Sequence, residues 1–327
     1  MQSTMNPSMG LGSAIPGSQA PRGRGQRRTR VLLGNRGSLP RRGRDAIARC
    51  AFPPLLAFAA VAFLASSPAV AQTRDVNFAV VGKHAGYEQV GAGKPKRQYY
   101  SFFSEIFLAD GTPLGEAVLV RPDGREVQFT DQRAVVGPSR DRILLIRGDR
   151  TYDSEAEIDQ EWPNGEYVFR YSPPGASAPV SIPVRLGEGR YPEGPQVWLE
   201  QNGEQVPFDG VDSMFDLVVR YTPFDSGRPD PREICDDMIF VILRDEENYK
   251  VDHSGRPFQG QRFMLYSDTE RVIPAAALAP ASRYALSVEH AILEETARAS
   301  GVPVMSTRAV TTALEIHTLP PLPQIMD

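Results

Sequence analysis

The stretch that most constrains the fold of this chain is a corner near residue 280, followed by an alternating segment. Leu278, Pro280 and Tyr284 stand at a Leu-x-Pro-x-x-x-Tyr spacing, and Leu286 and Val288 then alternate with small or polar residues. A β-sandwich uses such a corner where the chain crosses between its two sheets, because the tyrosine ring fills the core edge while its hydroxyl bonds to the backbone upstream. The stretch predicts a strand that starts at this corner.

Strand-like segments recur between residues 72 and 318. Short runs of Val, Ile, Leu, Phe and Tyr end at Gly, Pro or Asp turn signals, and residues 167–171 and 215–221 alternate most clearly. Spacings of about 8 to 12 residues with such punctuation are typical of an all-β sandwich. We therefore predict an all-β fold with two tandem antiparallel β-sandwich domains.

One short helix is expected to interrupt the strands. Ser154 and Glu157 form a capping box, and Trp162 lies one helical turn after Ile158. We expect this helix to lay Trp162 on a sheet edge. Tyr167 follows a Pro-Asn-Gly turn and predicts a second corner like that of Tyr284.

The N-terminal part has the pattern of a secretory signal. Residues 1–50 carry ten arginines and one acid, an apolar run follows at 55–65, and a small Ala-Val-Ala triplet ends at Ala71. The apolar run is shorter than the roughly 20 residues that a membrane-spanning helix needs. We expect cleavage after Ala71 and a periplasmic or extracellular protein with no membrane span.

Removing residues 1–71 makes the chain strongly acidic. The whole chain has 36 Lys and Arg against 40 Asp and Glu, and the part after Ala71 keeps 26 and 39 of them. A surface with this excess of acids repels phosphate backbones. Nucleic acid is therefore not an expected partner.

Composition shifts suggest where domains begin and end. A short stretch rich in Gly and Pro separates the two sets of strands, and a Pro-rich tail follows the last one. The expected parts are a basic region and signal peptide at 1–71, sandwiches at 72–189 and 196–318, a linker at 190–195, and a tail at 319–327.

The Leu278–Pro280–Tyr284 corner and a closing strand at 311–318 resemble a fibronectin type III domain over residues 195–318. The segment before the linker, with its Tyr167 corner, resembles a more divergent immunoglobulin-like sandwich. With the export signal, the pair is similar to uncharacterised exported bacterial proteins. This resemblance implies an architecture and no activity.

Motifs of catalysis are missing from the sequence. It has no Gly-x-Ser-x-Gly elbow and no His-Glu-x-x-His, and a single cysteine, Cys235, follows the signal. We expect His290 and His317 to be packed or edge residues on strands, and His84 and His253 to be solvated. No catalytic residue and no cofactor is predicted.

Acids cluster in the second half, where Asp225, Asp230, Asp236 and Asp237 are the candidate calcium ligands. Loops between sandwich strands can gather oxygen ligands for calcium. Their spacing fits no known loop template, so a solvated acidic surface is the alternative interpretation.

The sequence favours a non-catalytic exported protein that acts in adhesion, in surface structure or as an envelope accessory, with a protein or glycan partner. One alternative is a carbohydrate-binding module, with or without calcium, that uses the acidic loops and the exposed aromatic residues of the first domain. The aromatic residues between Tyr99 and Phe107 are candidates for a sugar-binding face, and packing in the sandwich core is the other interpretation of them. A hydrolase with an unrecognised site is the third hypothesis. Fold alone does not decide among them.

Overall fold

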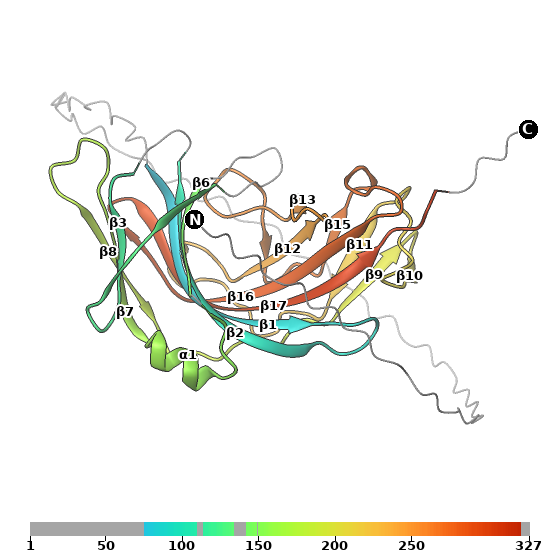
Figure 1. The fold of residues 1–327 in the computed structure, drawn as a ribbon, viewed down its shortest axis with the longest axis horizontal. Coiled ribbons are helices and arrows are strands. Elements are labelled where there is room, and N and C mark those ends of the chain that lie inside the picture. Colours follow the sequence, from blue (N-terminus) through green and yellow to red (C-terminus); the bar gives the residue numbers. More distant parts are fainter. Residues whose placement is uncertain (1–74, 110–113, 134–141, 149, 322–327) are drawn as a thin grey trace, which may run out of the picture. The chain divides into compact units, whose positions relative to one another are not determined.

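The computed structural model describes residues 75–109, 114–133, 142–148 and 150–321 (Figure 1). The expected signal at 1–71 and all but the first residues of the tail lie outside these ranges. Within them, the protein consists mostly of β-strands arranged in three sheets, as the strand pattern predicts. No helix among the described residues is long and apolar enough to span a membrane.

The large sheet has nine strands, and β14 (Met264–Leu265) is attached to its strand β12. The other eight follow one another in space as β13 (Lys250–His253), β12 (Met238–Arg244), β16 (Arg283–Ala299), β17 (Val302–His317), β1 (Val76–Glu88), β2 (Lys96–Leu108), β6 (Arg142–Arg147) and β5 (Thr130–Arg133).

Two four-stranded sheets complete the fold. The first small sheet has the order β4 (Glu126–Gln128), β3 (Ala117–Val120), β7 (Gly165–Tyr171) and β8 (Val180–Leu186). The second small sheet has the order β10 (Glu204–Val206), β9 (Val197–Gln201), β11 (Leu217–Tyr221) and β15 (Glu270–Ile273).

The large sheet does not divide at residues 190–195, where the sequence suggests a linker between separate sandwiches. Strand β1 pairs in parallel with β17, from Ala79 opposite Val304 to Glu88 opposite Ala313. In Figure 1 the long hairpin of β16 and β17 runs from the first small sheet to the second. Strands from both sides of the expected linker therefore share one sheet, a long-range pairing that no local pattern encodes.

Both small sheets pack on the same face of the large sheet, here named the sandwich face. On β17, Val304 and Val310 belong to the core under the first small sheet, whereas Leu314 and Ile316 belong to the core under the second. All four residues are an even number of positions apart, so their side chains point the same way. The opposite side, named the cleft face, receives the odd-numbered residues of β17, such as Met305.

The helix and both corners lie against these cores. Helix α1 (Glu155–Glu161) begins at Ser154, whose hydroxyl accepts a hydrogen bond from the Glu157 amide. The Trp162 ring stacks on Phe102 of β2, with ring centroids 3.8 Å apart. A 3-10 helix, η1 (Ala275–Ala277), precedes the corner at Tyr284. Local capping and aromatic packing thus set this part of the fold.

Candidate functional site

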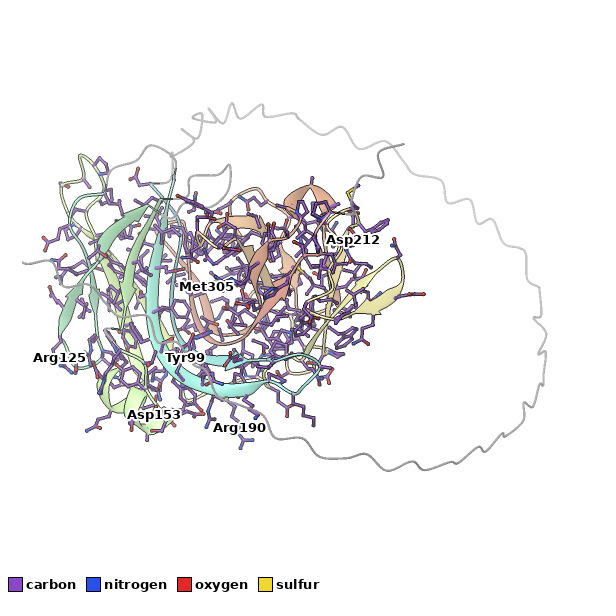
Figure 2. The ribbon with its side chains drawn as sticks, turned by 45° about the vertical axis from the view of Figure 1, so that its right-hand side comes forward. Tyr99, Arg125, Asp153, Arg190, Asp212 and Met305 are labelled. Carbon is purple, nitrogen blue, oxygen red and sulfur yellow. The ribbon has the colours of Figure 1, made fainter. Side chains whose placement is uncertain are left out.

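A cleft of about 910 Å³ opens on the cleft face of the large sheet. Its walls come from both halves of that sheet, and Tyr99 and Met305, which line it, are labelled in Figure 2. Aromatic rings and polar groups both contribute to its lining. The lining includes Tyr99, Phe103, Glu105, His84, Ser101 and Glu289.

Strand β1 forms the middle of the cleft floor, and two of its glycines leave space for aromatic rings of β2. A Cβ on Gly86 would come within 2.4 Å of the Tyr99 ring, and a Cβ on Gly82 within 2.9 Å of the Phe103 ring. Glycine in the interior of a strand often marks such a close approach. The two rings of β2 therefore lie over the two glycines, and His84 stands between them.

His84 belongs to a chain of hydrogen bonds that crosses four strands. Its Nε2 atom lies 2.8 Å from the Thr311 hydroxyl, and its Nδ1 atom lies 3.4 Å from the Ser101 hydroxyl. The Thr311 hydroxyl in turn donates to the Glu289 carboxylate at 2.8 Å. Although His84 and Thr311 are 227 residues apart in sequence, pairing of β1 with β17 makes them neighbours.

The donors and acceptors of this chain have one consistent assignment when Glu289 is ionised. Thr311 has one hydroxyl proton and donates it to Glu289, so it accepts the Nε2–H of His84. The Nδ1 atom of this neutral tautomer then accepts the proton of the Ser101 hydroxyl. The chain therefore runs in one direction, from Ser101 toward Glu289.

Desolvation favours the neutral forms of two cleft residues, Glu289 and His84. Desolvation raises the pKa of Glu289 to about 7, a shift that Glu105 increases and that the Thr311 hydrogen bond and Lys250 reduce. Desolvation also lowers the pKa of His84 to about 4. Glu105 on β2 and Glu289 on β16 both line the cleft, with β1 and β17 between their strands.

The geometry supports binding better than acyl transfer. Ser101 and His84 have the relation of a nucleophile and a base, but Ser101 lies in the middle of β2, directly opposite His84 in the β1–β2 ladder. The peptide N–H groups of such a ladder pair with the neighbouring strand, so they do not converge on a reacting oxygen as an oxyanion hole does.

The corner residues predicted from the sequence lie away from the cleft, on the sandwich face. The Tyr284 hydroxyl accepts a hydrogen bond from the Ala279 amide at 2.6 Å, and Leu278 is buried in the same core while Pro280 is exposed. The Tyr167 hydroxyl donates to the Pro163 carbonyl at 2.8 Å. These side chains position the strands.

Trp162 is packed among other side chains and does not line the cleft. Its indole N–H donates to the Tyr152 hydroxyl at 3.1 Å, and the Arg121 guanidinium lies 4.6 Å from the ring centroid. The ring is buried, with 6% of its surface exposed. Trp162 therefore packs within the first core, against Phe102 of β2, which is an interior strand of the large sheet.

The four candidate calcium ligands are not brought together as a metal site. Asp230 accepts hydrogen bonds from the amides of residues 232, 234 and 235 and from the Thr296 hydroxyl. Asp236 accepts from the Asp230 amide, and Asp237 accepts from the amides of residues 228 and 293. Asp225 is exposed. Among the residues that the structure describes, no group of three or more acids, histidines or cysteines could hold a metal ion.

These hydrogen bonds lower the pKa of both Asp230 and Asp237, but the net pKa shifts of the two acids are opposite. Desolvation alone would raise the pKa of Asp230, but the surrounding N–H and O–H donors outweigh it and lower the pKa. Desolvation dominates at Asp237, whose pKa is raised. The carboxylates thus organise the segment before β12 by satisfying its backbone amides.

Two histidines differ from their expected environments. His84 was predicted to be solvated at the end of a strand, but β1 continues to Glu88 and encloses it. His253, expected in a solvated loop, lies in β13, and desolvation lowers its pKa to about 3. His290 is packed as predicted, with its ring stacked on Phe224 at 4.4 Å.

The remaining chemistry-bearing residues are structural. His317 is half exposed beside Glu315, 2.7 Å away, and Cys235 is buried against Met238. Burial raises the pKa of the Cys235 thiol to about 12. A thiol with this pKa is not a nucleophile near neutral pH.

Sequence reasoning did not identify Ser101, Glu289 and Thr311 as neighbours of His84. One local signal was available, because two glycines flank His84 at a spacing of two residues on a strand. That spacing places all three on one face of the sheet and indicates that something lies close to β1. Which residues approach depends on the pairing of β1 with β2 and β17.

Comparison with known proteins does not assign this chain to a family. No protein family model matches it, and no curated protein matches it. Among solved structures, a chain titled "Biofilm associated protein - BSP domain" matches at 14% identity and a TM-score of 0.19. The match covers 67% of this chain and 27% of that one. A similarity this low supports no conclusion about fold or function.

Proposed function

We propose that this chain is an exported, non-catalytic binding protein whose ligand site is the cleft on the large sheet. The observation that carries the proposal is the convergence of Ser101, His84 and Glu289 in a space of about 910 Å³ between aromatic walls. Ligand sites typically occupy about 300 to 1,000 Å³ and combine apolar walls with a few placed polar groups.

The organisation of the cleft supports a binding role over a purely structural one. A polar chain that served only packing would be buried on all sides, since unpaired polar groups in a core are costly. His84, Ser101 and Glu289 are instead partly exposed, and all three line the cleft. A bound ligand can donate to the Ser101 oxygen and to the Glu289 carboxylate oxygen that Thr311 leaves free.

Export is inferred from the sequence of residues 55–71, and a role at the cell surface or in the envelope follows from it. The acidic balance of the chain after Ala71 supports a partner other than nucleic acid. Two immunoglobulin-like and fibronectin-like sandwiches that share a sheet remain our interpretation of the architecture. A calcium-dependent ligand is not favoured, because the Asp carboxylates already bind amides.

A thermal-shift screen tests the proposal. The purified chain would be melted with neutral oligosaccharides, peptides of either charge, and fatty acids, beside a Ser101→Trp variant that places an indole in the cleft. We expect at least one class to raise the melting temperature of the wild type and not that of Ser101→Trp. If no compound acts, or if the variant responds as the wild type does, the cleft is not the ligand site.

A further inference from the structure

We propose that the cleft binds a neutral saccharide, whose ring stacks on Tyr99 and whose hydroxyl groups donate hydrogen bonds to the oxygens of Ser101 and Glu289. This inference rests on the proposed function, because it names the ligand class of the same site.

Tyr99 provides an apolar platform with an accessible face. It is 37% exposed, whereas its neighbour Tyr100, which points to the sandwich face, is 3% exposed. Its ring lies over Gly86 and 5.9 Å from the His84 ring, centroid to centroid. Aromatic side chains offer apolar faces next to polar edges, and the C–H face of a sugar ring has the complementary character.

The polar groups beside Tyr99 match hydroxyl groups. The Ser101 oxygen, whose proton goes to His84, can accept from a ligand, and Glu289 has one oxygen on Thr311 and a second carboxylate oxygen that can accept. Each sugar hydroxyl donates once and accepts. Two neighbouring hydroxyls of a ring can therefore donate one hydrogen bond each to the Ser101 and Glu289 oxygens.

The charges that line the cleft disfavour an ionic ligand. Acids and bases are both present in similar number, so the lining has little net charge. The acids are Glu105, Glu247 and Glu289, and the bases are Arg150, Arg244, Lys250 and Arg256. An anion would meet the carboxylates and a cation would meet the guanidinium and ammonium groups, whereas a neutral polyol can bond to either sign.

The volume of about 910 Å³ lies toward the upper end of small-molecule sites. A short oligosaccharide fits this size better than a single sugar, which would leave much of the cleft filled with water. Phe103 over Gly82 supplies a second ring further along the floor. Tyr99 and Phe103 lie four residues apart on β2, about 13 Å along a strand, so the two rings can contact separate units of one oligosaccharide.

An extended peptide is a poorer fit for the floor. Peptides that add to a sheet use the unpaired N–H and C=O groups of an edge strand. Strands β16, β17, β1 and β2, which form the floor, each have a partner on both sides. A peptide in the cleft would therefore find no backbone ladder and would leave its own amides without partners.

The experiment is isothermal titration calorimetry of the purified chain with cellohexaose, chitohexaose and mannohexaose at pH 7.5. We expect at least one of them to bind, and Tyr99→Ala to weaken its affinity about tenfold, which corresponds to about 1.4 kcal/mol. The matched control is Phe215→Ala, which removes an aromatic ring of 44% exposure outside the cleft and should leave affinity unchanged.

If Tyr99→Ala does not fold, Ser101→Trp serves as the second variant and should abolish the same binding. Failure of all three hexasaccharides, together with a peptide or fatty acid that binds the wild type and not Ser101→Trp, would overturn the saccharide inference and keep the proposed function. Failure of every class would overturn both. Chain shortening of a bound hexasaccharide, detected by chromatography, would overturn the non-catalytic assignment.

Discussion

Two residues that are adjacent on β1, Lys83 and His84, show how the two faces of the large sheet differ. Both are polar, and both bond to a side chain of another element, Lys83 to Asp159 of α1 and His84 to Thr311 of β17. Lys83 points to the sandwich face and has no exposed surface, whereas His84 points to the cleft and is partly exposed. The same strand therefore serves a sealed polar network on one side and an open site on the other.

The network on the sandwich face, called the sealed network, consists of Lys83, Asp159, Asn164, Arg308 and Glu294. Each buried charge in it has a partner of opposite charge. The Lys83 ammonium donates to Asp159 at 2.5 Å and to Asn164 at 2.6 Å. Arg308, opposite Lys83 in the β1–β17 ladder, donates to Glu294 at 2.8 Å and to Asn164 at 3.0 Å. Desolvation lowers the pKa of Lys83 even with Asp159 beside it.

The same network also forms hydrogen bonds to the segment that follows β8. Glu294 accepts hydrogen bonds from the amides of Gly187 and Gly189, and Arg308 donates to the Gly187 carbonyl. The Arg308 guanidinium lies 5.2 Å from the centroid of the Tyr191 ring. The segment that the sequence suggests is a linker is thus held to the large sheet at the junction of the two cores.

Whether a polar residue of this sheet stabilises the fold or is available to a ligand depends on what covers its side of the sheet. Where the small sheets and the connecting segment cover the strand, charges are fully paired and serve stability. Where no sheet covers it, the polar chain ends in a cleft and is available to a ligand. Substitutions on the two faces should therefore differ most in the free energy of unfolding.

The largest expected effect is that of Arg308→Met. It leaves the Glu294 carboxylate buried without its cation, and breaking a buried pair in this way costs about 3 to 5 kcal/mol. Urea denaturation measures the change. The matched control is Arg283→Met, which removes an exposed Arg–Glu pair with Glu315 and should cost less than about 1 kcal/mol. Equal losses in the two variants would contradict the contrast between sealed and exposed pairs.

The second effect is a pH dependence at Glu289. Its pKa in the folded protein, about 7, exceeds its unfolded value of about 4.5, so the group favours the folded state below pH 4.5 and loses that contribution as pH rises through 7. Glu289→Gln removes this loss. We expect the variant to gain stability over the wild type by up to about 3 kcal/mol between pH 4.5 and pH 8.

Three histidines act in the other direction. Desolvation lowers the pKa values of His84, His253 and His290, so they destabilise the folded protein as pH falls below about 6.5. His253 and His290 are not part of the hydrogen-bond chain that ends at Glu289, so the difference between the two unfolding curves removes their contribution. His84 is linked to Glu289 through Thr311, so the difference reports these two groups together. Parallel curves from pH 4.5 to pH 8 would show that Glu289 titrates as an exposed acid.

A smaller effect distinguishes two tyrosines. Tyr284→Phe removes the acceptor of the Ala279 amide at the corner and should cost about 1 to 2 kcal/mol. Tyr99→Phe, in the cleft, should change the free energy of unfolding by less than about 0.5 kcal/mol, because Tyr99 is partly exposed. Chemical denaturation of both variants tests this, and a larger loss for Tyr99→Phe would mean that the cleft wall supports the fold.

The smallest expected effect is that of calcium. The carboxylates of Asp230, Asp236 and Asp237 already accept backbone amides, so millimolar calcium should leave the melting temperature within about 1 °C. Scanning calorimetry with calcium and with a chelator measures it. A rise of several degrees would show that the acidic segment rearranges to bind the ion.

The sequence was sufficient for features that depend on near neighbours. Alternation predicted the strands around Tyr167 and Leu217, and the capping box at Ser154 predicted the short helix, because side-chain direction and helix caps are set by a few consecutive residues. It was not sufficient for the length of β1, since Gly82 and Gly86 resemble loop residues until the rings that lie over them are known.

By itself, then, the sequence determined an all-β chain, the predicted export signal and the corner geometry. Only the tertiary structure decided that β1 pairs with β17, which joins the two sets of strands in one sheet and places His84 beside Thr311. The physical reason is that strand direction is a local property with a period of two residues, whereas strand partners are chosen by burial across more than two hundred residues. The cleft exists because of that choice.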